Sequence, residues 1–253
     1  MDVLEHVEQL RSDGERLAGV ASSTDPESPV PTCPGWRLRD LVRHVGGVHR
    51  WATGFVRGDG VQPPDGDLER LVGGWPDDAE LAAWFRTGHR ALVDALRSAP
   101  ADLDTWTFLD APTPLAFWAR RQAHETAIHR VDAESAAGDV TGFPSAFAAD
   151  GIDELLLRFV GRPGRTLPVD APRSMLARAT DVPRSWRLTF TPTGFDNQAD
   201  PADADGDAEL TVTGDAAALY VLLWNRRDTV GLELQGTPDL LDLWRETVRI
   251  TWT

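Results

Sequence analysis

The spacing of apolar residues changes near residue 140, and this change restricts the chain to a fold of two different parts. Before that point, apolar side chains recur every three or four positions, as in amphipathic helices, over residues 2–22, 37–57 and 78–98. A fourth helix is marked by Thr113 and Pro114 at its start and by Gly138 at its end, residue types that favour those positions. Four such helices favour a bundle.

The second part of the chain mixes short helical patterns with strand patterns. Alternation of apolar and polar residues predicts three strands, at residues 186–191, 209–213 and 230–235. Helices are expected over residues 146–160, 215–226 and 237–247, and the acidic segment 195–209 is expected to be a loop. We therefore predict two domains: a helical bundle over residues 1–142 and a smaller α+β domain over residues 143–253.

Composition excludes several functions. The chain has 25 basic and 40 acidic residues, a net charge of −15, which argues against nucleic acid or an anionic membrane as a partner. Every basic residue is Arg, so a Schiff-base lysine is excluded. The single cysteine, Cys33, excludes a disulfide framework and a cysteine-rich metal site. Without a signal peptide or a membrane-spanning segment in the pattern, a cytoplasmic protein is expected.

The segment FWARRQAHETAIHRVDAE, residues 117–134, carries the clearest chemical signal. Glu125 and His129 are four residues apart, so a helix places them one turn apart on the same face. His124 lies about 140° around the helix from His129, too far to share a metal with it. His44, the polar residue in the apolar stripe of residues 37–57, is the best candidate for a third ligand, and His49 is expected to face elsewhere.

Spacing alone leaves simpler interpretations open. A single histidine on an apolar helix face is commonly a hydrogen-bonded core residue. Glu125 and His129 could equally form an ordinary pair within one helix.

The segments VPTCPGWRLRDLVRHVGGVHRW (30–51) and FWARRQAHETAIHRVDAE (117–134) together resemble the mycothiol-dependent maleylpyruvate isomerase family. The N-terminal half of that family belongs to the DinB-like metal-binding four-helix bundles. Residues 148–156 and the tail from LTVTGDAAALYVLLWNRR onward resemble its C-terminal α+β domain, which is similar to sterol-carrier folds.

This resemblance implies a divalent metal, usually zinc, held by two histidines and a glutamate. At the matching positions of this chain these are His44, Glu125 and His129. It also implies mycothiol as a thiol cosubstrate, so the expected function is that of an isomerase or an S-transferase acting on a small electrophile through a metal-activated thiolate. The alternatives are a metal-dependent hydrolase on the same bundle and a non-catalytic protein that binds a small ligand.

Four further side chains are candidates for supporting roles. Asp40 and Asp132 lie four residues before His44 and three after His129, so either could accept the free N–H of its histidine. Arg226 and Arg227 follow an apolar helical run; one could bind a substrate carboxylate, or both could be ordinary surface residues. The residue pattern identifies neither the substrate nor the oligomeric state.

Overall fold

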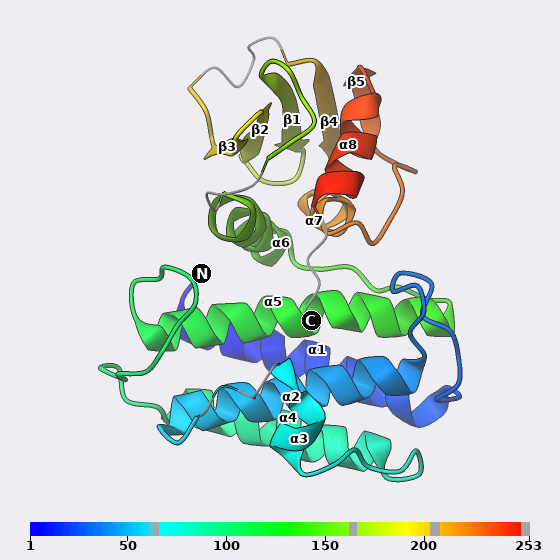
Figure 1. The fold of residues 1–253 in the computed structure, drawn as a ribbon, viewed down its shortest axis with the longest axis vertical. Coiled ribbons are helices and arrows are strands. Elements are labelled where there is room, and N and C mark those ends of the chain that lie inside the picture. The colour runs from blue at the N-terminus through cyan, green and yellow to red at the C-terminus, as the bar shows by residue number, and fades with distance from the viewer. Residues whose placement is uncertain (61, 63–65, 162–165, 203–207, 249–253) are drawn as a thin grey trace. The chain divides into compact units, whose positions relative to one another are not determined.

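The computed structural model describes residues 1–248, apart from residues 61, 63–65, 162–165 and 203–207. The chain divides into two compact units, residues 1–141 and 142–252 (Figure 1). The first unit is helical and the second contains a mixed sheet. The expected fold class, a helical bundle followed by an α+β part, is confirmed.

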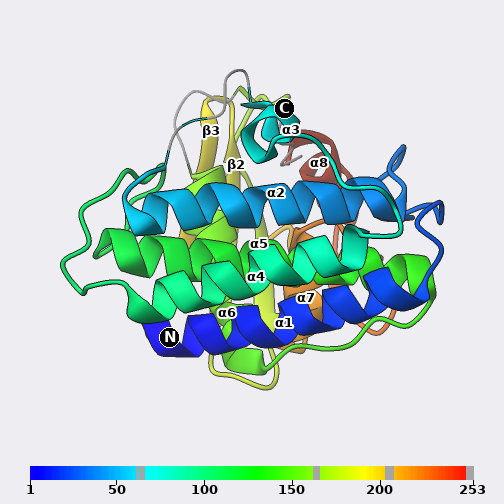
Figure 2. The same cartoon turned by 90° about the horizontal axis from the view of Figure 1, so that it is seen from below.

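The long helices of the described first unit form a bundle of four, seen side by side in Figure 2. These helices are α1 (Val3–Ser23), α2 (Leu38–Arg57), α4 (Leu81–Ser98) and α5 (Pro114–Ala137). Helix α5 packs against α1 and α2, and α4 packs against the same two helices from the other side. A short helix, α3 (Leu68–Val72), lies against α2.

Local sequence explains where α5 begins and ends. The Thr113 hydroxyl accepts a hydrogen bond from the backbone N–H of Ala116, and Pro114 occupies the first turn, where a missing N–H costs nothing. At the other end Gly138 adopts a φ of 100°, the left-handed conformation that glycine enters without strain. Both predicted boundaries are confirmed.

The sheet of the second unit has the strand order β3-β2-β1-β4-β5 among the described residues. Its strands are β1 (Arg173–Ala179), β2 (Ser185–Thr191), β3 (Gly194–Ala199), β4 (Leu210–Gly214) and β5 (Glu233–Gly236). Strands β1 and β4 are parallel, with Met175 opposite Leu210, and the other pairs are antiparallel. The accompanying helices are α6 (Ser145–Asp153), η2 (Glu154–Val160), α7 (Ala216–Leu223) and α8 (Asp239–Thr247).

Two strands were not predicted from the sequence, and the strand predicted over residues 230–235 begins only at Glu233, as β5. Strand β1 lies in the middle of the sheet and buries three successive residues, so it lacks the alternation by which strands are recognised. Strand β3 falls in the segment expected to be an acidic loop, because an edge strand pairs on one side only and tolerates polar residues. The helix predicted over residues 146–160 changes at Glu154 from α-helix to π-helix.

Within the described ranges, no helix has both the length and the hydrophobicity needed to cross a membrane.

Candidate metal centre

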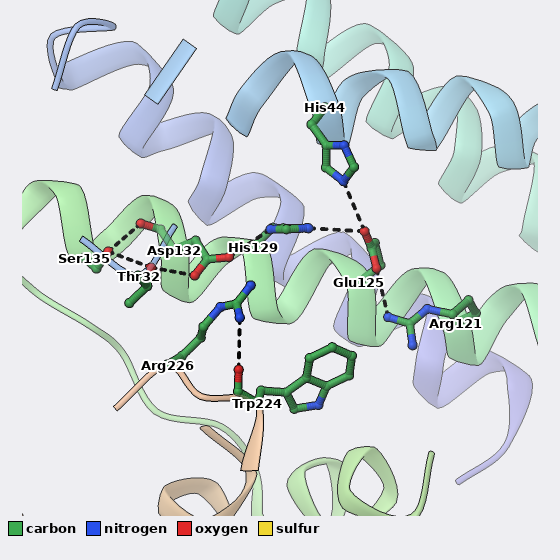
Figure 3. Close-up of polar contacts among 9 residues, drawn as sticks. All are labelled: Thr32, His44, Arg121, Glu125, His129, Asp132, Ser135, Trp224 and Arg226. Carbon is green, nitrogen blue, oxygen red and sulfur yellow. Dashed lines mark hydrogen bonds and ion pairs between the residues drawn. The ribbon is translucent and has the colours of Figure 1, made fainter. Parts of the chain in front are cut away.

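Three side chains with metal-ligating atoms converge between α2 and α5 (Figure 3). Glu125 Oε1 lies 3.5 Å from Nε2 of His44 and 3.2 Å from Nε2 of His129. One ligating atom from each residue lies within 4.8 Å of those from the other two. The structure thus brings together the three residues that the sequence predicts as ligands.

Helix geometry explains this convergence. Glu125 and His129 are one turn apart on α5, so their side chains share a face. His44 on α2 meets that pair, and seven residues further along α2 the ring of Trp51 contacts Trp118, at 5.2 Å between centroids. From His44 to Trp51 the chain runs toward the C-terminus of α2, whereas their partners, Glu125 and then Trp118, run toward the N-terminus of α5. The two helices are therefore antiparallel.

A hydrogen bond from Nδ1, the ring nitrogen away from Glu125, fixes the orientation of His129. Its Nδ1 lies 2.9 Å from Asp132 Oδ2, and the other oxygen of Asp132 accepts a hydrogen bond of 2.6 Å from the hydroxyl of Thr32 (Figure 3). Because a carboxylate only accepts, the Nδ1 of His129 carries the proton of this hydrogen bond. The lone pair of a neutral His129 is then on Nε2, the atom that faces Glu125.

Glu125 is held in a similar way by its own helix. Arg121, one turn earlier on α5, donates a hydrogen bond of 3.0 Å from Nη2 to Glu125 Oε2. Both side chains are almost fully buried. The guanidinium therefore occupies one carboxylate oxygen and leaves the other, Oε1, directed at the two histidines.

The surroundings of the cluster shift the pKa values of all three side chains. Burial raises the pKa of Glu125, but its polar contacts with His129 and His44 outweigh burial and hold that pKa well below its usual value. Burial lowers the pKa of His129, and its bond to Asp132 and contact with Glu125 reverse this and raise it to about 9. Burial also lowers the pKa of His44, which favours the neutral ring that a metal needs.

The donor atoms fit a cation. His44 Nε2 and Glu125 Oε1 are buried, and neither makes a hydrogen bond of good geometry within the described part of the chain. Without an ion, a protonated His129 supplies the positive charge that faces Glu125; with both rings neutral, as ligands must be, a cation would have to supply it. Two imidazoles and one carboxylate form a donor set typical of a zinc site with an open position.

The remaining candidates lie elsewhere. The His124 ring contacts the His6 ring edge-on, at 5.9 Å between centroids, on another face of α5. The fully buried His49 pairs through Nε2 with the Thr126 hydroxyl at 2.8 Å. Asp40 accepts a hydrogen bond from the backbone N–H of Arg37 at the start of α2, so of the two predicted carboxylate partners only Asp132 bonds its histidine within the described part of the chain.

Thr32 and Arg121 were not predicted from the sequence. Thr32 is 100 residues from Asp132, and no local pattern pairs them. Arg121 stands four residues before Glu125, a spacing that could have indicated an ion pair.

In the second unit, Arg226 donates from Nη1 to the backbone oxygen of Trp224 at 3.0 Å, and Arg227 donates to backbone oxygens of its own loop. A substrate-binding role for either arginine stays a prediction.

Comparison with known proteins gives consistent matches. The family model described as the mycothiol maleylpyruvate isomerase N-terminal domain matches residues 7–134, and the MDMPI C-terminal domain matches residues 146–243. Among solved structures, the chain is similar to the mycothiol-dependent maleylpyruvate isomerase (15% identity, TM-score 0.62) and to a histidine-to-alanine mutant of it (14%, 0.65). Both matches cover 93% of each chain. No curated protein matches the chain. At such identities the structural likeness concerns the fold.

Proposed function

Since the chain belongs to the mycothiol maleylpyruvate isomerase family, as its sequence motifs predicted, we propose that it is a metal-dependent enzyme that uses a low-molecular-weight thiol. The thiol would be mycothiol and the reaction an isomerisation or an S-transfer on a small electrophile. The observation that carries this proposal is the buried cluster of His44, Glu125 and His129, whose ligating atoms lie within 4.8 Å of one another.

In this proposal the three side chains hold a divalent cation, most simply Zn²⁺. Such a cation supplies the positive charge that makes a thiol ionise at neutral pH. Asp132 keeps the proton of His129 on Nδ1, so that Nε2 is available as a ligand. Arg121 neutralises and orients Glu125 through Oε2. The side chains of His44 and His129 are 12% and 11% exposed, so a small molecule can approach their side of the cluster.

Bulky aromatic side chains lie near the cluster. The Trp36 ring lies edge-on to His44 at 5.2 Å, and Trp118, on the same face of α5 as Glu125, is fully buried.

In an isomerisation, addition of a thiolate to one carbon of a cis double bond leaves a single bond that rotates. Loss of the same thiolate then restores the double bond in the trans form. In an S-transfer the adduct is the product.

Metal content tests the proposal first. The purified full-length protein should contain about one equivalent of metal by elemental analysis, and His129→Ala should contain little. His49→Gln, which alters a buried histidine of α2 outside the cluster, is the matched control and should keep the metal. Equal metal content in the wild type and His129→Ala would contradict the site.

Thiol binding tests the function. Calorimetric titration with mycothiol should show binding to the metal-loaded protein and a clear loss of affinity after the metal is removed. Turnover of a substrate without any thiol would favour the hydrolase instead. Binding of an apolar ligand by the second unit that survives metal removal, with no thiol dependence, would favour the non-catalytic alternative.

A further inference from the structure

Gln122 is a buried amide that the proposed chemistry leaves without a role. Its side chain is 1% exposed, and Oε1 has no hydrogen-bond partner among the described residues. Buried polar atoms are bonded in the large majority of cases, so an unbonded amide oxygen is costly unless something else pairs with it. Gln122 lies on α5, three residues before Glu125.

The position of Gln122 on α5 directs it toward α2. At about 100° per residue, Gln122 lies about 40° from Trp118 on one side and about 40° from Thr126 on the other. Both neighbours contact α2: Trp118 touches the ring of Trp51, and Thr126 pairs with His49. Gln122 therefore faces α2, about 4.5 Å along the axis of α5 from Glu125.

Trp51 supplies a second unbonded polar atom on the facing helix. Its Nε1 is buried and has no hydrogen-bond partner in the described part of the chain. Trp51 follows His44 by seven residues, which places it two turns along α2 on the same face. Gln122 precedes Glu125 on α5. Because α2 and α5 are antiparallel, Gln122 and Trp51 both lie on the same side of the candidate metal centre along the helix axes.

We propose that Gln122 and Trp51 form a polar subsite for a neutral amide or hydroxyl group of the thiol; this rests on the proposed function. The indole N–H can only donate, and the amide oxygen accepts. An amide of the ligand matches both, since its N–H can bond Gln122 and its C=O can bond Trp51. The ligand class is a thiol that carries a neutral amide within about one helical turn of its sulfur.

Two probe thiols of equal chain length separate this subsite from general packing. N-acetylcysteamine carries an amide two methylene groups from its sulfur, and pentane-1-thiol has the same number of chain atoms without polar groups. The full-length protein is loaded with Co²⁺, and binding of each thiol is followed by the thiolate–cobalt absorption band. The variants are Gln122→Leu and Trp51→Phe, which remove the polar atoms and keep most of the volume.

In Gln122→Leu we expect N-acetylcysteamine to bind roughly ten-fold more weakly and pentane-1-thiol to bind no more weakly than in the wild type, because only the former loses a hydrogen bond. Trp51→Phe, an independent variant, should change the two affinities in the same directions. Cobalt content should not change. Replacing an unbonded buried oxygen by an apolar group should also leave the melting temperature unchanged or higher.

The outcomes distinguish the subsite from the function on which it rests. Equal losses for both thiols, or no loss for either, would overturn the subsite and leave the thiol-dependent function standing. Absence of a thiolate band with either thiol in the wild type would overturn both.

Discussion

At the scale of single residues, two of the three candidate ligands direct one atom toward the candidate metal centre and bond a neighbouring side chain through another atom. Glu125 gives Oε2 to Arg121 and presents Oε1, and His129 gives Nδ1 to Asp132 and presents Nε2. Holding the rear atom removes rotamers that would turn the ligand atom away. The affinity of the centre for a metal should therefore depend on residues that never touch the metal.

Asp132→Asn tests this dependence. The amide is a weaker acceptor than the carboxylate and carries no charge, so we expect Zn²⁺ affinity to fall by about 10- to 100-fold. Competition with a chromophoric chelator measures the change. Asp40→Asn is the control: it weakens the cap of α2 and should lower stability slightly without altering metal affinity. Equal affinities of the wild type and Asp132→Asn would show that the hydrogen bond to His129 has no such role.

The sequence predicts the three candidate ligands because spacing and motif point to the same residues, and it predicts their supports poorly. Asp40 and Asp132 stand at similar distances from their histidines, and only tertiary packing decides which of them bonds. Thr32 reaches Asp132 across 100 residues of sequence. Gln122 looks like an ordinary polar residue of α5 until its burial and unbonded oxygen are seen.

At the scale of elements, predictability follows the strength of local signals. The four long helices were predicted to within three residues at each end, because amphipathic spacing and helix caps are local. Helix α4 begins at Leu81, three residues later than predicted, since the preceding residues form a turn. Strands β1 and β3 could not be predicted, because the burial of one and the edge position of the other are set by their neighbours in the sheet.

The packing of α2 against α4 gives a test at this scale. A Cβ at Gly46 would lie 2.1 Å from the Trp84 ring, which also stacks with the Arg50 guanidinium at 3.7 Å. We expect Gly46→Ala to displace the ring and lower the free energy of unfolding by about 1–3 kcal/mol.

Gly19→Ala is the matched control, because Gly19 is an exposed helical glycine with nothing within 4 Å of the added methyl group. Alanine should raise stability there by roughly 0.5–1 kcal/mol. Urea denaturation of both variants measures the difference. Stabilisation by both substitutions would show that Trp84 adjusts without cost and that close contact at Gly46 does not determine how the two helices pack.

At the scale of the whole molecule, the bundle also contains buried charge where α5 packs against α1. Arg130 is fully buried and joins α5 to α1: its Nε lies 3.0 Å from Asp13 Oδ1, and its Nη1 lies 2.8 Å from Glu134 Oε2. Two carboxylates thus share one buried guanidinium. The ionisation of Asp13 should make the stability of the fold depend on pH.

Burial raises the pKa of Asp13 from its ordinary 3.8 to about 6, although Arg130, Gln9 and Arg16 oppose the shift and Glu134 adds to it. Because this pKa is higher in the folded than in the unfolded state, the folded protein binds more protons between about pH 4 and 6. The contribution of Asp13 to stability is therefore greatest at low pH and is lost as the pH rises through this range, by about 3 kcal/mol in all.

Asp13→Asn removes this titration, so it should match the wild type near pH 4 and be more stable by up to about 3 kcal/mol above pH 7. Chemical denaturation at several pH values between 4 and 8 measures the difference at each pH. Other titrating groups, including the buried His49 and His89, are common to both proteins and cancel in that difference. Asp94→Asn, an exposed change on α4, should follow the wild type throughout. A variant less stable than the wild type at pH 7 would mean that the charge of Asp13 stabilises Arg130 by more than its own burial costs.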